Sequence, residues 1–297
     1  MSAGVAYALG AYAIWGLLPI YLHALRGVDP GEILAHRIVW SLATMAILLL
    51  ALRRLAWIAA LREAPAAVLR FFATSALVTV NWLVFIWAVQ HGRTVDASLG
   101  YYMNPLVSLV LGWLLLGERL RPGQIACVAI LAAAVAWLTW QAGSFPWIGL
   151  SLAFSFALYG LLRKTAPLGS LEGFALEVVL LFPFALGYLA WMGEGAGTAF
   201  GAGSAGMRTL LVLAGPLTAI PLLLFTAGAR RIPLSRLGIL QYTAPTLQWL
   251  TGIFVFHEAL DPHKALGFGV IWLALALFAL ESAWVGWQQK REAEASP

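Results

Sequence analysis

The chain has 297 residues, of which 62% are hydrophobic and only 10% are charged, and its mean hydropathy is +0.86. Water-soluble domains carry about 25% charged residues, so this composition excludes an ordinary soluble protein. The net charge of +5 would suit a nucleic-acid partner, but the basic residues alternate by loop, as in membrane proteins, and no nucleic-acid partner is expected.

Apolar stretches long enough to cross a membrane recur along the whole chain. A bilayer core of about 30 Å needs about 20 mostly apolar residues in a helix, and continuous runs favour helices over the short alternating segments of a membrane β-barrel. The sequence therefore predicts an all-α membrane protein. Ten transmembrane helices are expected, over residues 4–25, 31–52, 71–90, 97–116, 123–142, 145–162, 173–192, 209–229, 237–256 and 265–287.

The basic residues indicate the orientation of these spans. With the N-terminus inside, 13 of the 18 lysines and arginines fall in inside segments, four fall outside, and Arg37 lies within the second span. Cytoplasmic loops are enriched in lysine and arginine. Both termini are therefore expected in the cytoplasm.

The fourth and ninth spans share a pattern at an offset of 140 residues. The matching residues are Tyr102, Pro105, Gly112, Glu118, Leu120 and Pro122 in the first copy, and Tyr242, Pro245, Gly252, Glu258, Leu260 and Pro262 in the second. The first and sixth spans match more weakly, AIWGLL at 13–18 against ALYGLL at 157–162. The pattern predicts two five-helix repeats, residues 1–143 and 144–297, and because five is odd the second is inverted. Inverted repeats are typical of secondary transporters with a substrate site near the membrane midplane.

Several runs of the sequence resemble the RarD-type permeases of the EamA branch of the drug/metabolite transporter superfamily. These runs are EILAHR (32–37), NWLVFIWAVQHGRTVDASLGYYMNPLVSLVLGWLLLGERL (81–120), SFALYGLLRK (155–164) and QYTAPT (241–246). The resemblance covers nearly the whole chain. It implies ten helices in two inverted EamA repeats, a bacterial inner-membrane location and export of small molecules. Such proteins carry the label chloramphenicol-sensitive protein, which does not establish that drug as the physiological substrate.

One stretch departs from the family pattern. It is GEGAGTAFGAGSAG at 193–206, where six of 14 residues are glycine. Glycine-rich segments behave as flexible chains, so we expect a flexible linker without a binding role.

Arg37 lies about six residues inside its span. An arginine at the centre of a membrane helix costs about 2.5–3.5 kcal/mol on insertion scales, so such residues face a bundle interior or a watery cavity. Ser41, four residues on, falls on the same helix face. We interpret Arg37 and Ser41 as part of a substrate pathway for an anionic or polar group, with a structural arginine bonded to backbone carbonyls as the alternative. Nearer the outer end, Glu32 and His36 are expected to form a hydrogen-bonded polar pair at the interface, with a direct substrate role as the alternative.

Arg37 corresponds to Glu177 in the seventh span at the same offset of 140. We expect these two residues near opposite ends of one pathway, more than about 10 Å apart along a membrane core of about 30 Å, and not as a direct pair. Apolar surroundings favour the protonated form of a carboxyl group. Glu177 is therefore a candidate for proton coupling, with a structural hydrogen bond as the alternative.

Further polar and aromatic residues at membrane depth are assigned to the substrate pathway, where rings and a few polar groups typically line a binding site. They are Trp15, Asn81, Trp82, Tyr101, Asn104, Tyr159, Gln241 and Tyr242. Hydrogen bonds between helices are the alternative for the polar ones. Prolines that interrupt the hydrogen bonds of their helices are expected at Pro19, Pro105, Pro183, Pro221 and Pro245.

The sequence lacks the phosphate-loop motif G-x-x-x-x-G-K-[ST] and the nucleophile motif G-x-S-x-G, and HEALDPH at 257–263 has the wrong spacing for a helical zinc site. We predict no enzyme activity, no cofactor and no metal. The predicted function is a secondary transporter that exports a small metabolite or drug-like molecule by alternating access. A passive channel or membrane scaffold and, less favoured, a membrane-embedded enzyme are the alternatives. The expected partners are a small-molecule substrate and the lipid bilayer, and a homodimer is left open.

Overall fold

A computed structural model describes residues 3–55, 58, 65–117, 119–142, 145–164, 166–194, 197–229, 231–232, 240–259 and 262–295. Within these residues every regular element is a helix, which confirms the all-α prediction. The helices are α1 (Ala3–Ala24), α2 (Pro30–Ala51), α4 (Pro65–Gln90), α5 (Thr94–Leu116), α6 (Pro122–Ala142), α7 (Trp147–Lys164), α8 (Ser170–Glu194), α9 (Ala199–Ala202), α10 (Ala205–Ala229), α12 (Thr243–Leu250), the π-helix η1 (Thr251–Val255) and α13 (Pro262–Ala295).

Seven of the described helices are long and apolar enough to cross a membrane, namely α1, α2, α4, α5, α8, α10 and α13. Two others, α6 and α7, contain shorter apolar stretches. Large apolar side chains point outward from several of them, such as Ile47, which is 70% exposed, and Leu69, which is 73% exposed. Such a surface suits lipid, not water. Each expected span overlaps one of the described helices, and the count of ten crossings stays a prediction.

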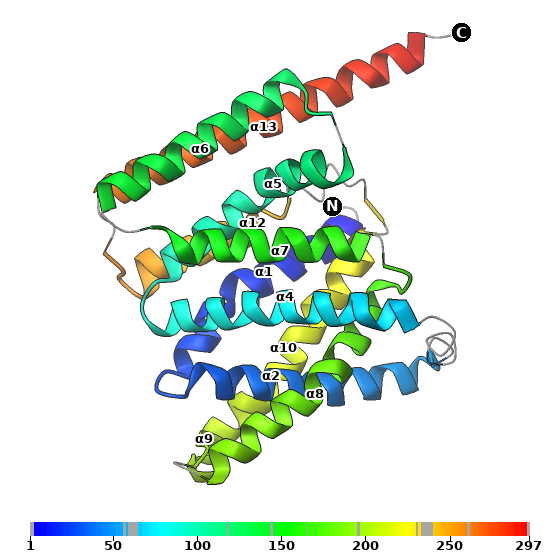
Figure 1. Cartoon of the computed structure of the whole chain (residues 1–297), viewed down its shortest axis with the longest axis vertical. Helices are drawn as coiled ribbons and strands as arrows, with labels where there is room; N and C mark the ends of the chain where they lie inside the picture. The colour runs from blue at the N-terminus through cyan, green and yellow to red at the C-terminus, as the bar shows by residue number, and fades with distance from the viewer. Residues whose placement is uncertain are drawn as a thin grey trace.

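The long helices lie side by side, so that their connections gather at two opposite ends (Figure 1). One end carries the α1–α2, α4–α5 and α12–α13 connections, and we call it the predicted external end. The other carries the α2–α4 and α7–α8 connections and both chain termini, and we call it the predicted cytoplasmic end. The two termini therefore share one end, as the alternation of basic loops requires.

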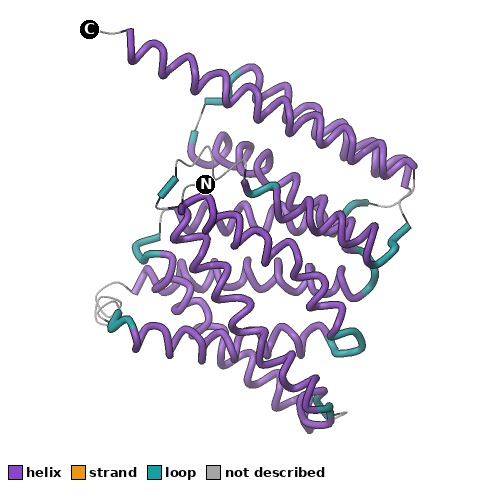
Figure 2. The backbone as a smooth tube through the Cα atoms, turned by 180° about the vertical axis from the view of Figure 1, so that it is seen from behind, coloured by secondary structure: helices purple, strands orange, loops and turns teal. Residues whose placement is uncertain are grey.

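Helices α6 and α13 form a pair at one edge of the molecule, which Figure 2 shows from behind. Arg121 at the start of α6 donates to both carboxylate oxygens of Glu281 on α13, at 2.6 and 2.7 Å. A two-pronged arginine–carboxylate contact is among the stronger side-chain interactions. The polar cross-link therefore fixes how the two otherwise apolar helices align.

The contacts between helices follow the predicted repeats. Helix α1 packs against α10 and α12, and its counterpart α7 packs against α4 and α5. Helix α2 likewise packs against α10, while α8 packs against α4. The backbone agrees at the ends of the fourth and ninth spans, where Gly117 and His257, 140 residues apart, both have a left-handed φ, 67° and 52°. These correspondences support the two-repeat prediction. Glu118, one of the matching residues, lies outside the described residues.

The ninth expected span, residues 237–256, differs from the other long helices. Residues 237–239 lie outside the described part, and the helix proper begins at Thr243 and changes to π-helical geometry from Thr251. Pro245 therefore lies in the first turn of α12, where its missing N–H has no helical partner to lose. The prediction that Pro245 interrupts a helix is wrong, whereas Pro19, Pro105, Pro183 and Pro221 do lie inside helices.

The glycine-rich segment is also more ordered than expected. It contains the short helix α9, whose first two backbone N–H groups, those of Ala199 and Phe200, donate to the two carboxylate oxygens of Glu32 at 3.0 Å each. At its other end, Arg208 donates to the carbonyls of Phe200 and Gly201, both at 2.9 Å. Charged side chains therefore hold both ends of the short helix, which composition alone did not reveal.

Glu258 has a similar role on α5. Its two carboxylate oxygens accept the backbone N–H groups of Thr94 at 2.8 Å and Val95 at 2.9 Å. The first N–H groups of a helix have no partner within it, and a carboxylate there also favours the positive end of the helix dipole. Glu258 thus anchors the start of α5, the helix that carries several candidate site residues.

We expect Glu258→Ala to lower the free energy of unfolding by about 1–2 kcal/mol, the usual cost of losing a helix cap. The measurement is thermal unfolding of the purified protein followed by tryptophan fluorescence. Glu258→Gln keeps one side-chain carbonyl oxygen as an acceptor and should lower the free energy of unfolding by less. Equal melting temperatures for wild type and Glu258→Ala would show that the cap contributes nothing.

Candidate functional site

The predicted site residues fall into four groups in the structure. The first surrounds Arg37, the second surrounds Glu177, the third lies where α5 and α12 meet, and the fourth is the Glu32–His36 pair under α9. They occupy different places along the bundle, so each is described separately.

Arg37 lies in the interior of the bundle, with 6% of its surface exposed. Its Nε donates to Thr218 Oγ1 on α10 at 2.8 Å, and its guanidinium carbon lies 4.3 Å from the centre of the Trp82 ring on α4. Such stacking of a cation on an aromatic face is favourable and fixes the plane of the guanidinium. Helices α4 and α10 thus meet α2 around this one cation.

The terminal Nη groups of Arg37 have no hydrogen-bond partner among the described residues, and no described carboxylate forms an ion pair with it. These unpaired Nη groups are not fully enclosed by the surrounding protein. One turn further along α2, Ser41 is completely buried, and its hydroxyl lacks a partner in the described structure. Arg37 and Ser41 therefore offer unused hydrogen-bonding groups on one face of α2, inside the bundle.

Asn81 connects the Arg37 group to α7. Its side-chain nitrogen donates to the Leu152 carbonyl and the Ser155 hydroxyl, both at 3.0 Å. Its side-chain oxygen accepts the Tyr101 hydroxyl at 3.0 Å. Asn81 is 1% exposed, and these bonds hold Tyr101 in place. Asn81, the neighbour of Trp82 on α4, thus forms interhelical hydrogen bonds.

Glu177 is 1% exposed and has three partners of its own. Thr74 of α4 donates to one carboxylate oxygen at 2.7 Å, and Tyr159 of α7 donates to the other at 3.1 Å. Arg163 of α7 forms an ion pair with it, at 3.7 Å between Nε and Oε1. The sequence prediction placed Glu177 among apolar side chains, and the structure corrects this, because a threonine, a tyrosine and an arginine surround the carboxylate.

Helix α4 relates the Arg37 and Glu177 groups to each other. Thr74 binds Glu177, and Trp82 stacks on Arg37, eight residues later on the same continuous helix. At 1.5 Å per residue this separates the two contact points by about 12 Å. Arg37 and Glu177 therefore have separate partners at separate depths.

Trp15, Asn104, Gln241 and Tyr242 belong to the third group, near α12. The backbone carbonyl of Trp15 accepts Gln248 Nε2 at 3.2 Å, and Tyr242 stacks on Tyr102 with ring centres 6.4 Å apart. The Tyr242 hydroxyl and the Asn104 side-chain oxygen are buried and unpaired within the described structure. Gln241 is half-buried at the start of α12. These residues are not part of the Arg37 group.

The Glu32–His36 pair lies at the predicted external end. His36 Nε2 is 3.8 Å from Glu32 Oε1, too far for a hydrogen bond, because Glu32 instead binds the N–H groups of α9. His36 accepts the Trp40 indole N–H at 3.2 Å and stacks on Phe200 of α9. The two residues are neighbours, but the prediction of a hydrogen bond between them is wrong, because both contact α9 instead.

Sequence reasoning missed Thr218, Thr74 and Arg163. Arg163 had a detectable signal, because it lies four residues after Tyr159 and so on the same helix face. The signal for the two threonines was weaker. They are 144 residues apart, the offset that also relates AIWGLL to ALYGLL.

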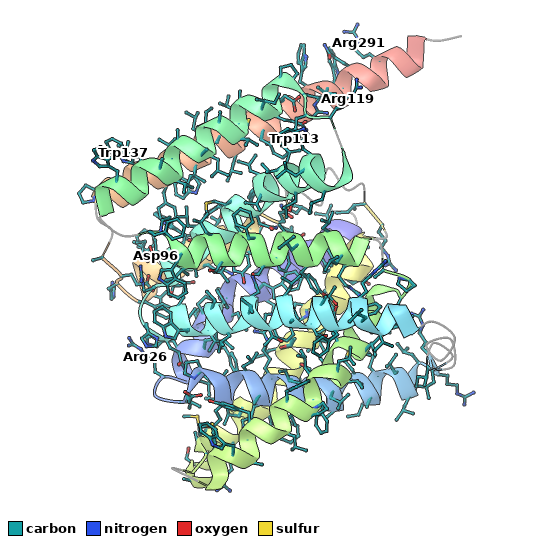
Figure 3. All side chains as sticks on the ribbon, in the orientation of Figure 1. Arg26, Asp96, Trp113, Arg119, Trp137 and Arg291 are labelled. Carbon is teal, nitrogen blue, oxygen red and sulfur yellow. The ribbon has the colours of Figure 1, made fainter. Side chains whose placement is uncertain are left out.

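Charged residues elsewhere are distributed toward the two ends of the bundle. Figure 3 shows Arg26 and Asp96 at the predicted external end, and Arg119 and Arg291 at the other. Arg26 is exposed, which makes it a matched control for the buried Arg37. Within the described residues, no three histidine, cysteine, aspartate or glutamate side chains converge in a way that would hold a metal ion.

Comparison with known proteins identifies the family. The EamA-like transporter family matches residues 2–140, and Protein RarD of Streptomyces exfoliatus is 43% identical over 99% of this chain and 93% of its own length. The chain belongs to the RarD-type EamA permeases. This permease is also 46% identical to the Bacillus subtilis transporter YojE, with 96% of each chain covered. It is 34% identical to the chloramphenicol-sensitive protein RarD of Pseudomonas aeruginosa, with 94% of each chain covered.

A crystal structure of another protein has the same fold as this permease. The TM-score is 0.61 over 96% of this chain and 99% of that chain, at 19% sequence identity. At this identity the likeness concerns the fold alone.

We expect Thr218→Val to destabilise the permease by about 1–3 kcal/mol, because the buried Arg37 Nε then loses its acceptor. Thermal unfolding in detergent measures the change, and Thr218→Ser should restore most of the loss. Thr209→Val is the matched control, since Thr209 bonds to the carbonyl four residues before it on the same helix, as Thr218 does, but is exposed. An equal effect of both valine substitutions would mean that the contact with Arg37 does not contribute to the stability of the folded protein.

Proposed function

We propose that this permease is a secondary transporter of the bacterial inner membrane that exports a small metabolite or drug-like molecule by alternating access, with both termini in the cytoplasm. The family and relatives named as transporters support membrane transport. The observation that carries the proposal is Arg37, a buried cation with hydrogen-bonding groups left unused where α2, α4 and α10 meet. An arginine kept in a membrane interior at a cost of several kcal/mol is by default a functional residue.

The proposed substrate pathway passes between the two repeats. The helices around Arg37 are α2 and α4 of the first predicted repeat and α10 of the second. A site shared by two repeats changes its exposure when one repeat tilts against the other, which is how inverted-repeat transporters alternate access. Arg37 and Thr218 link the repeats directly, so a relative movement of α2 and α10 changes the site itself.

The proposal is tested by flux of a labelled metabolite library through the purified permease in liposomes, with and without a pH gradient. We expect Arg37→Gln to reduce flux of the transported solutes at least about tenfold, because a hydrogen bond to a charged group contributes about 1.5–3 kcal/mol. Arg26→Gln removes the same charge at an exposed position and should leave flux unchanged.

Equal flux in wild type and Arg37→Gln would remove Arg37 from the pathway and direct attention to the group near α12. Unsaturable flux that never exceeds the imposed gradient would indicate a channel. A chemically altered product would indicate an enzyme.

For Glu177 we propose a role in proton coupling, supported by its complete burial and by the ion pair with Arg163. Protonation of the carboxylate would weaken its attraction to Arg163, so the contact between α7 and α8 would depend on proton binding. We expect Glu177→Gln to bind substrate but to transport it independently of the pH gradient.

The matched control is Glu172→Gln, because Glu172 lies on the same helix and also pairs with an arginine, Arg54, at 2.9 Å. Gradient-dependent flux should persist in this variant. Full gradient dependence in Glu177→Gln would leave Glu177 with a structural role only.

A further inference from the structure

The geometry of the Arg37 guanidinium leaves one part of it available for a ligand. Its Nε is engaged by Thr218 and its face lies over the Trp82 ring, whereas both Nη groups lack a partner among the described residues. The pair of Nη groups forms the end of the guanidinium fork, which matches the two oxygens of a carboxylate. The fork is therefore held in place by protein contacts, with its outer edge left free.

The charge balance inside the bundle favours a particular ligand charge. The buried carboxylates of the described structure already have partners. Glu32 accepts backbone N–H groups of α9, and Glu177 forms an ion pair with Arg163. Arg37 is then a buried cation without a described counter-charge. One negative charge on the ligand would neutralise it, whereas a cationic ligand would add a second positive charge at short range in a medium of low dielectric constant.

The surroundings of the fork indicate what the rest of the ligand is like. An aromatic ring, that of Trp82, lies against the face of the guanidinium, 4.3 Å from its central carbon. The hydroxyl of Ser41 is a free hydrogen-bonding group on the same face of α2 as Arg37. A flat apolar body therefore fits these surroundings better than a polyhydroxylated one.

Resting on the proposed function, we infer that the substrate is an organic monoanion: a single carboxylate on an apolar, ring-bearing body, bound end-on by the two Nη groups of Arg37. Thr218 and Trp82 position the guanidinium. The complex of Arg37 with such an anion is neutral overall, and a neutral site moves between the two faces of the membrane at lower electrostatic cost than a charged one.

The test uses probes that share a ring and differ only in the head group. Phenylacetate, phenylacetamide, phenethylamine and phenylalanine form one series, and indole-3-acetate, indole-3-acetamide, tryptamine and tryptophan form a second. Binding to the purified full-length permease is measured by thermal unfolding, because a ligand that binds only the folded protein stabilises it by an amount that rises with the logarithm of its concentration over Kd. We expect the carboxylate of at least one series to bind at least about tenfold more tightly than its neutral, cationic and zwitterionic counterparts, the difference that one charge-assisted contact makes.

Variants separate charge from geometry. Arg37→Gln should remove the preference for the carboxylate, and Arg37→Lys, which keeps the charge without the fork, should recover less than half of it on a logarithmic scale. Arg26→Gln should behave as wild type. Three binding results would overturn the inference. One is equal or tighter binding of the amide, amine or amino acid in both series. The others are a carboxylate preference that persists in Arg37→Gln and an absence of carboxylate binding in both series.

Flux in liposomes distinguishes this inference from the proposed function. Transport of neutral or cationic solutes that depends on Arg37 would overturn the monoanion and support the transporter. Carboxylate binding that depends on Arg37, with no flux of any solute across the membrane, would support the monoanion site and overturn the transporter.

Discussion

The burial of one guanidinium is the constraint on which the centre of this molecule depends. Arg37 is buried, so the surrounding helices must supply its contacts, and they do so from α4 and α10. Each contact leaves the charge itself uncompensated: one is a hydroxyl and the other an aromatic face. A buried carboxylate partner would have made a stable structural pair. Its absence among the described residues is what turns a costly residue into a candidate binding group.

The second buried charge, that of Glu177, does have a counter-charge. Glu177 has a hydroxyl from α4, a phenol from α7 and the guanidinium of Arg163. The two charges are nevertheless related, because a threonine joins α2 to α10 at Arg37 and another threonine joins α8 to α4 at Glu177. In the predicted repeats, α2 corresponds to α8 and α10 corresponds to α4, so each of these two helix pairs is the counterpart of the other. The same arrangement thus surrounds Arg37, which has no counter-charge among the described residues, in one half and Glu177, which is paired with Arg163, in the other.

The sequence predicted the helices better than the contacts between their polar groups. Runs of about 20 apolar residues are long enough to leave little choice of structure, and most boundaries fall within a few residues of the observed ones. Burial of Arg37 followed from the cost of charge in lipid. Its partners did not, because Thr218 is 181 residues away and only tertiary packing joins them. The glycine-rich segment was misjudged for a similar reason, since composition does not reveal that Glu32 and Arg208 hold the two ends of α9.

The repeat pattern predicted more than the fold, because the offset of 140 residues by itself pairs Arg37 with Glu177. In the predicted inverted repeat, equivalent positions lie at opposite depths, so the two residues are not expected to meet. Helix α4 contacts both groups, at Thr74 and at Trp82, and is continuous between them. In the proposed cycle, a change at Glu177 therefore has a direct mechanical route to the Arg37 fork: a shift of α4 by a fraction of a helical turn would move Thr74 relative to the carboxylate and Trp82 relative to the guanidinium together. Coupling between the two charges then needs no direct contact, only a stiff helix that both of them touch.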